Sequence, residues 1–519
     1  MKIYHGTIIS CDESDNIHSY LVEDKGRILF IGDSLPDRYN KESIIELGKK
    51  ALIPSFADTH LHFSSFALFH SGINVSSARS NKEIIEQLRS YHVSNEKIIV
   101  GFGLSPHSVE EGKMISRVEL DSVSLNLPVF LVKYDGHACV VNSELLKILP
   151  TEISEMRGFN AERGEMGQDA FFAVTDFVTN SISPILLIKN MIRAYDYMSK
   201  QGLGMFHTVS GVGFPGDLDV DLERWLARGI GSGIQTRLFF QTMDIPKVLK
   251  RKLPRIGGCF ATALDGCFGS VDAALLAPYE GTDNRGVLYY SDDEIFDFCR
   301  KANRADLQIE VHAIGDAAFD QASRALDSAL KDYPRKDHRH GIIHACLPTE
   351  RGIDICAEQG IQLPMQPAFL NWPQEPSSYL RSILGEREAK LNPLSSLWKR
   401  GILLSGGSDA PCTTPDPISG IHWACNHPVP EEALTPLQAL KMFTINGYKS
   451  SFDEKERGSL EEGKIADMVL LSGNPLEIGI SDLKNLEVEE TIYGGKPYRD
   501  RSPGALSSIG KGLISRSSI

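Results

Sequence analysis

Between about residues 54 and 450, short apolar runs alternate with helical patterns, and this alternation constrains the fold more than any other feature. Helical patterns such as Asp293–Ala305 and Asp316–Lys331 separate the runs. About eight such repeats predict an α/β fold built as a (β/α)8 TIM-like barrel. A doubly wound sheet is the alternative, but no Gly-x-Gly-x-x-Gly or phosphate-binding loop follows a first strand. The strand-length runs are Ile98–Gly101, Val129–Lys133, Gly204–Thr208, Thr236–Phe240, Ile309–His312, Gly341–His344 and Ile402–Ser405.

The two ends of the chain have a different, β-rich character. Runs at Lys2–Ile9 and Arg27–Gly32 resemble in composition those at Gly463–Leu471 and Val488–Tyr493. We expect both ends to pair into one small β-sandwich domain. The expected organisation is therefore 1–53 and 451–500 for the two parts of the β-domain, 54–450 for the barrel, and 501–519 for a flexible tail rich in Ser and Gly.

The charge and the apolar runs limit the possible partners. The formal net charge of -14 argues against nucleic acid or an anionic membrane, both of which require basic patches. No apolar run approaches the ~20 residues of a spanning helix, and a signal peptide is not evident, so we expect a cytoplasmic protein with a small-molecule substrate. Nine cysteines without close paired spacing predict reduced thiols, most of them in the core. A homo-oligomer is possible.

Five residues at the ends of apolar runs predict a metal site. His60 and His62 are two residues apart, so on a strand both side chains point the same way. His312, His344 and Asp409 each follow an apolar run, and the carboxyl ends of barrel strands form the face where active sites lie. A single histidine in such a place is more often a core residue, but this explanation does not suit the whole pattern. Imidazoles with one carboxylate suit a divalent ion, with zinc as the first choice.

Other polar residues also follow predicted strands. Asp135, His137 and Asn142 come after Val129–Lys133 and are assigned to substrate binding, with turn-capping as an equally good explanation for each. His207 ends another run and is expected to line the same pocket. Lys133 could reach the metal, although a solvated or ion-paired lysine is the preferred interpretation.

The order His-x-His, His, His, Asp resembles the metal-dependent amidohydrolase superfamily. Short sequence motifs of this chain are similar to those of the YtcJ-like (amidohydrolase 3) branch, which includes N-substituted formamide deformylases. The resemblance covers about residues 2–500. The words that carry it are 54–62 (PSFADTHLH), 135–143 (DGHACVVNS), 264–266 (LDG), 277–279 (APY) and 458–467 (GSLEEGKIAD).

The resemblance implies roles for the five residues. His60 and His62 would bind the buried metal, with Asp409 as a further ligand and catalytic proton acceptor. His312 and His344 would bind a second ion, or His312 would bind the single ion while His344 polarises the water or substrate. Two-metal members bridge their ions with a carboxylated lysine four residues before the Asp-Gly word, where this chain has Ala261. One ion is therefore favoured, with two possible.

The implied activity is hydrolysis of a carbon–nitrogen bond other than a peptide bond, by metal-activated water. An N-acyl or N-formyl amide is the expected substrate. A deaminase on the same scaffold is the nearest alternative. The residue at 261 also motivates another class of function, a non-catalytic descendant that binds a ligand or regulatory partner.

Overall fold

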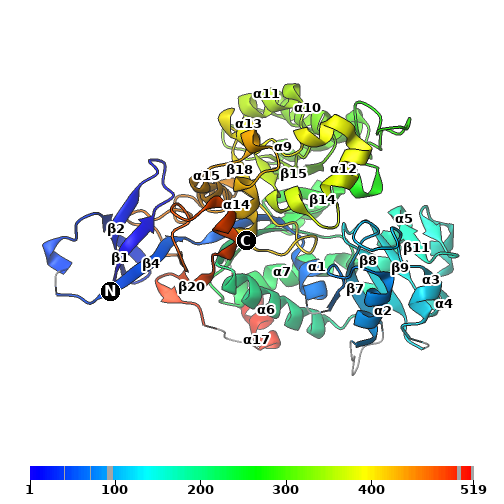
Figure 1. Ribbon diagram of the computed structural model, residues 1–519, viewed down its shortest axis with the longest axis horizontal. Coiled ribbons are helices and arrows are strands. Elements are labelled where there is room, and N and C mark those ends of the chain that lie inside the picture. The colour runs from blue at the N-terminus through cyan, green and yellow to red at the C-terminus, as the bar shows by residue number, and fades with distance from the viewer. Residues whose placement is uncertain (40, 71, 91–97, 125, 500–503, 516–519) are drawn as a thin grey trace.

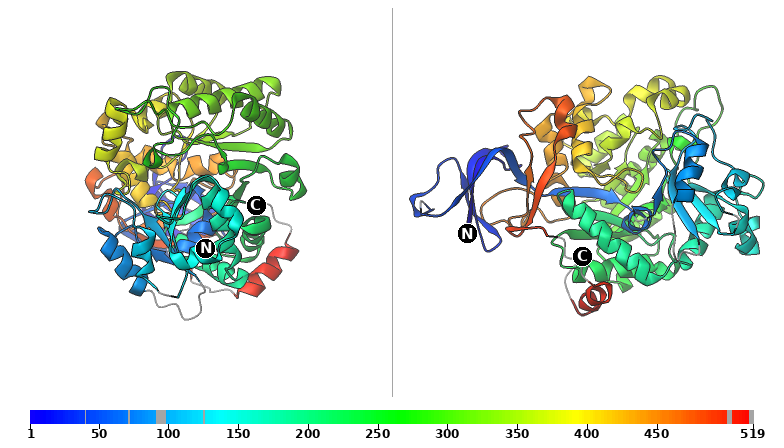
Figure 2. Two further views of the ribbon diagram at one scale, coloured as in Figure 1. Left: turned by 90° about the vertical axis from the view of Figure 1, so that its right-hand side faces the viewer. Right: turned by 60° about the horizontal axis from the view of Figure 1, so that its bottom comes forward.

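The computed structural model describes residues 1–39, 41–70, 72–90, 98–124, 126–499 and 504–515. Three parts follow one another along the long axis in Figure 1. A sheet built from the chain ends stands at one end, a barrel with its helices lies in the middle, and a smaller α/β unit lies at the other end. Figure 2 shows from a further side how the blue N-terminal strands stand apart from the barrel.

The central part is a parallel sheet of six strands that is nearly closed. Its order is β16-β15-β14-β13-β12-β5. Two further strands form a separate parallel pair, linked to β16 by a bridge between Gly341 and Gln362 and to β5 by a hydrogen bond from Asp409 N to His60 O of 2.8 Å. A TIM-like barrel fits this arrangement, while the count of eight strands stays a prediction. The bounds are β5 Phe56–Leu61, β12 Leu203–Ser210, β13 Gln235–Phe240, β14 Arg255–Ala263, β15 Gln308–Ala313 and β16 Gly341–His344, with β17 Leu363–Met365 and β18 Leu404–Gly406 as the pair.

The barrel strands are buried on both faces. All residues of β5, β12, β15 and β16 are buried, as expected for parallel strands covered by helices. In Figure 1, α10 and α11 lie above the strands and α6 and α7 below them. The helices here are α1 Phe63–His70, α6 Pro184–Lys200, α7 Leu218–Gly229, α8 Ile245–Lys250, α9 Asp292–Arg304, α10 Asp316–Asp332, α11 Glu350–Gln359, α12 Ser377–Leu384, α13 Leu394–Lys399, α14 Pro417–Cys425, α15 Pro436–Met442 and α16 Ile445–Ser450.

The two chain ends pair as expected. Strand β19 lies antiparallel to β4, with Met468 opposite Pro54 and Leu471 opposite Ala51. The strands form one seven-stranded sheet in the order β21-β20-β19-β4-β1-β2-β3, and the sandwich of two layers stays a prediction. The bounds are β1 Lys2–Ile9, β2 Ile17–Asp24, β3 Arg27–Gly32, β4 Ile44–Pro54, β19 Met468–Leu471, β20 Val488–Tyr493 and β21 Lys496–Pro497.

Two runs expected in the barrel belong instead to the smaller α/β unit. The runs Ile98–Gly101 and Val129–Lys133 contribute to β7 and β8 of a second six-stranded sheet, ordered β10-β11-β9-β8-β7-β6. A short buried apolar run looks the same in either sheet, so periodicity did not distinguish them. The elements are β6 Ile73–Asn74, β7 Ile99–Leu104, β8 Val129–Lys133, β9 Ala138–Val141, β10 Phe159–Asn160 and β11 Glu165–Gly167, with α2 Asn81–Ser90, α3 Arg117–Asp121, α4 Ser143–Ile148 and α5 Gln168–Asn180.

The tail expected to be flexible contains a helix. Helix α17 (Ala505–Ile514) packs along α7, where Gly229 and Gly512 let the two backbones approach closely: a Cβ on Gly512 would lie 1.8 Å from Trp225 O. Composition alone suggested too little burial, whereas the small residues are what permit the contact. Residues 501–503 and 516–519 of that tail lie outside the described residues.

Within the described ranges, no single helix is long and apolar enough to cross a membrane. The bent pair α5 and α6 passes that test by length and composition only. Both helices bury residues within the protein, including Phe171 of α5 and Met191 of α6.

Candidate metal centre

His60 and His62 meet Asp409 at the carboxyl end of the barrel. His60 lies on β5, His62 directly follows it, and Asp409 follows β18. Asp409 Oδ1 lies 3.2 Å from Nε2 of both imidazoles, and all three residues are buried. Nitrogen and oxygen ligands at about 2.1 Å from one tetrahedral zinc lie about 3.4 Å apart, so these spacings fit a shared ion.

His312 and His344 approach the same point from the adjacent strands β15 and β16. The imidazole centroids of His312 and His344 are 4.6 Å apart, and those of His60 and His344 are 5.3 Å apart. His344 Nδ1 lies 2.7 Å from Gln366 Oε1. Donation of that N–H to Gln366 leaves the Nε2 lone pair free to face the centre. The five residues predicted from the sequence therefore converge, although their roles as ligands stay a prediction.

The electrostatics of the cluster suit a cation. Burial lowers the pKa of His60, lowers that of His312 well below its ordinary value, and lowers that of His344 to about 4, so the imidazoles are neutral near pH 7. Burial alone would raise the pKa of Asp409, but His60 and His62 hold it well below the usual value. Neutral imidazoles beside a carboxylate form a donor set of the kind that divalent ions bind.

The backbone is strained at two of these residues. His344 and the next residue, Ala345, have φ of 72° and 44°, and Asp409 has φ of 54°. Such left-handed conformations cost non-glycine residues about 1–3 kcal/mol each and concentrate at functional sites. The surrounding hydrogen bonds hold this arrangement in place.

Two buried aspartates hold the loops around the cluster, and no sequence signal distinguishes them from capping residues. Asp58 accepts hydrogen bonds from the backbone N–H of His60 and of Ser408. Asp265 accepts three, from Ala274, Ile314 and Gly315, and thereby fixes the segment after His312. Burial raises the pKa of Asp58 to about 7 and that of Asp265 to about 8.

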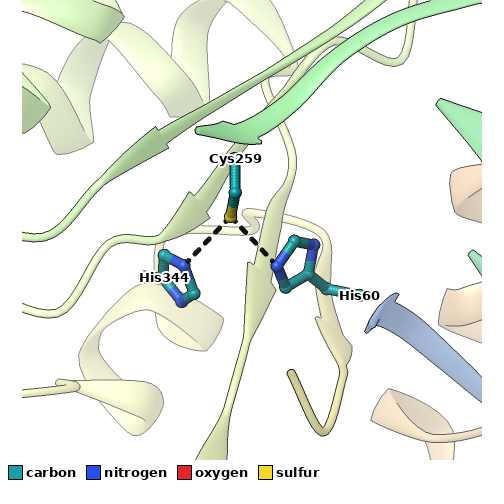
Figure 3. Close-up of side chains that lie close together, drawn as sticks. All are labelled: His60, Cys259 and His344. Atoms are coloured by element: carbon teal, nitrogen blue, oxygen red, sulfur yellow. Dashed lines mark hydrogen bonds between the residues drawn. The ribbon is translucent and has the colours of Figure 1, made fainter. Parts of the chain in front are cut away.

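Most cysteines are predicted to be core thiols, but the sulfur of Cys259 on β14 lies inside the cluster. Figure 3 shows Sγ between the imidazoles of His60 and His344. The distances from Sγ are 3.2 Å to His60 Nε2, 3.5 Å to His312 Nδ1 and 3.6 Å to His344 Nε2. Counting back from Asp265 pointed to Ala261 and missed this residue.

Lys133 does not reach the cluster. Its Nζ is 2.6 Å from Asp135 Oδ2 and donates to Ser270 Oγ and Gly269 O, with the ammonium buried. These partners occupy the ammonium, so this structure offers no support for the possible metal-binding role. The ion-paired alternative is the one observed.

Asn142 and His207 are not available to a substrate in this structure. Asn142 is fully buried and caps α4: its Oδ1 accepts from Leu145 N and Val129 N, and its Nδ2 donates to Leu127 O. His207 is 1% exposed inside the barrel and does not line the cavity described below. Neither residue lines the cavity, since a strand end can point into the core as well as into a pocket, and their roles in substrate binding stay a prediction without support from this geometry.

Asp135 and His137 do line a cavity beside the cluster. The cavity of about 430 Å³ opens between the barrel and the smaller α/β unit, and His62, Cys259, His312, His344 and Asp409 form its floor. Its walls include several aromatic side chains, among them Phe102, Phe130, Phe171, Phe172, Phe260, Phe268, Phe369 and Trp372. Apolar walls with a few convergent polar groups are typical of small-molecule sites.

The position of Asn142 leads to a stability prediction. Replacing Asn142 by Ala removes the cap of α4 and the partner of the Val129 N–H, so we expect a loss of about 2–4 kcal/mol in the free energy of unfolding, measured in urea. Asn126→Ala, at an exposed loop position, is the control and should change it by less than about 0.5 kcal/mol. A raised KM at unchanged stability would restore the substrate-binding assignment.

Comparison with known proteins fits this geometry. The model of the amidohydrolase family matches residues 257–498. The putative amidohydrolase YtcJ of Bacillus subtilis (strain 168) is 26% identical over 96% of this chain and 99% of its own length. The chain is similar to the amidohydrolase family, and over nearly its whole length to the YtcJ-like branch of that family. These similarities support an enzyme that hydrolyses carbon–nitrogen bonds.

Two other similar proteins extend the comparison. The N-substituted formamide deformylase of Arthrobacter pascens is 23% identical over 95% of this chain and 97% of its own length. An uncharacterised metal-dependent hydrolase from Pyrococcus horikoshii OT3 superposes with a TM-score of 0.74, at 22% identity, over 92% of this chain and 99% of that one. The latter similarity concerns the fold.

Proposed function

We propose that this amidohydrolase cleaves an N-acyl or N-formyl amide of a small molecule, using a divalent metal ion held by His60, His62, His312, His344 and Asp409. The observation that carries the proposal is the convergence of these five buried side chains from four strand ends. Four of them, all but His60, line one cavity. Zinc suits imidazole with one carboxylate, and one ion is favoured over two. The same proposal includes β17 and β18 as the strands that complete an eight-stranded barrel.

The side chains of the site have different roles in the proposed amide hydrolysis. When bound, a divalent ion supplies Lewis-acid chemistry, because it polarises a carbonyl and makes water more acidic. Asp409 accepts the proton of the attacking water and delivers it to the leaving nitrogen. His344, oriented by Gln366, presents Nε2 to the reacting centre. Asp135 is already bound to Lys133, so it acts on a substrate only through its remaining acceptor capacity.

The cavity narrows the substrate class to amides with an apolar substituent. Phe171 and Phe172 of α5 line the cavity together with Phe369 and Trp372, whose rings are stacked with centroids 4.5 Å apart. Burying an aromatic group against such walls is favourable by about 25 cal/mol per Å² of apolar surface. The relative from Arthrobacter is named for N-substituted formamides, which supports this class.

A substrate panel tests the proposed function. We expect zinc-reconstituted protein to release formate or another carboxylate, together with an amine, from N-benzyl or N-aryl amides faster than from N-methyl amides. Chelation should abolish turnover and zinc should restore it. Ammonia release from aminated rings without amide cleavage would favour a deaminase. If the protein binds no metal and hydrolyses no amide, the result would favour the alternative of a non-catalytic protein that binds a ligand or regulatory partner.

A further inference from the structure

Cys259 differs from the other cysteines in its surroundings. All nine cysteines lie in described parts of the chain as free thiols, and eight of them pack in or against apolar clusters. Cys259 is 4% exposed, belongs to none of those clusters, and has three imidazoles within 3.6 Å of its sulfur. Packing of a small apolar side chain therefore does not explain its position.

A bulge in β14 brings Cys259 to this place. Gly258 pairs with Val311, and the next pairing is Ala263 with His312, so the segment 259–262 has no counterpart on β15. Phe260 lies within it at φ 39°. The extra residues turn the Cys259 side chain into the barrel mouth, whereas the backbone carbonyl of Ala261 accepts a hydrogen bond from Tyr290 Oη. A count of residues along a regular strand consequently selects the wrong position.

The spacings around Sγ fit a shared ion. Sulfur and nitrogen ligands at about 2.3 and 2.1 Å from one tetrahedral zinc lie about 3.6 Å apart, close to the distances observed here. A second observation points to the same ion: Asp409 Oδ1, on a residue 7% exposed, has no hydrogen-bond donor in suitable geometry among the described residues. His60, Cys259 and His344 can offer three ligand atoms within 4.8 Å of one another, and so can His60, His62 and Asp409.

We infer that Cys259 is a thiolate ligand of the metal and takes the part that a carboxylated lysine plays in two-metal relatives. The inference rests on the proposed function and adds a ligand that the sequence comparison had placed at Ala261. On binding, the S–H bond breaks, its proton leaves to solvent, and a sulfur lone pair forms the bond to the metal without any redox change. A thiolate favours zinc or cobalt over magnesium and manganese.

Cobalt spectroscopy tests the inference. Purified protein is stripped with a chelator and loaded with Co²⁺, and we expect a near-ultraviolet charge-transfer band from sulfur to cobalt. Cys259→Ser should lose this band and bind zinc at least about tenfold more weakly. Cys299→Ser, in the buried face of α9 away from the cavity, is the matched control and should keep the band. A band that persists in Cys259→Ser overturns the inference.

Alkylation of the wild-type protein tests the inference without any substitution that could unfold the chain. Cys259 lines the cavity, so iodoacetamide should label it in wild-type protein after metal removal and not in zinc-loaded protein, as read by peptide mass spectrometry. Equal labelling in both states contradicts the inference. If labelling is equal but the protein still binds zinc and hydrolyses amides, the proposed function stands and only the role of Cys259 is refuted. Wild-type protein that takes up neither zinc nor cobalt refutes both the proposed function and the role of Cys259.

Discussion

Asp409→Asn is expected to lower kcat for amide hydrolysis by about 1,000-fold or more while the protein stays folded. The amide keeps the shape of the side chain but neither accepts the proton of water nor supplies an anionic oxygen beside His60 and His62. General acid–base groups contribute about 10²–10⁴-fold, and weaker metal binding adds to the loss. Steady-state kinetics with excess zinc, together with metal analysis and circular dichroism, measure both effects.

Asp416→Asn is the matched control for this variant. Asp416 caps α14 by accepting a hydrogen bond from Ser419 N and does not line the cavity. Asparagine caps helices about as well as aspartate, so activity should stay within about twofold of wild type. Full turnover by Asp409→Asn would remove Asp409 from the chemistry.

Lys133→Met is expected to destabilise the protein by about 3–5 kcal/mol, the largest effect on folding among these variants. Lys133 and Asp135 are 5% and 8% exposed, and loss of the ammonium leaves a buried carboxylate unpaired. The double variant Lys133→Met/Asp135→Asn should recover most of the loss, because no charge is then left without its partner. Urea unfolding of Lys133→Met, Asp135→Asn and the double variant, each compared with wild type, measures the coupling.

The stabilisation that the Lys133–Asp135 ion pair provides changes with pH in a defined direction. Burial alone would raise the pKa of Asp135, but Lys133 lowers it to about 2. The wild-type carboxylate therefore contributes stability above its unfolded pKa of about 4, and this contribution is lost as the pH falls towards 2. The difference between wild type and Lys133→Met should accordingly shrink from pH 6 to pH 3. Lys82→Met, at an exposed pair with Glu86, should cost less than about 1 kcal/mol at every pH.

Strands β7 and β8 lie in a different sheet from the barrel strands, which shows that hydrophobic periodicity does not predict the sheet to which a strand belongs. Val129–Lys133 has the same buried apolar character as Gly341–His344, yet the two strands lie in different sheets. Burial on both faces fixes the composition of a strand, whereas its neighbours depend on pairings between distant segments. Lys133, Asn142 and His207 lie away from the predicted site for the same reason, because each was inferred from a strand end without knowledge of its sheet or face.

Local sequence patterns predict the elements whose physical cause is local. Alternation of side chains on a strand places His60 and His62 on one side, and apolar runs that end in His312, His344 and Asp409 predict the face on which they meet. The identity of the residue that completes the cluster depends on the tertiary structure. A bulge in β14 and its register against β15 bring Cys259 inward in place of Ala261. That register depends on hydrogen bonds between strands far apart in the chain, and no local pattern encodes them.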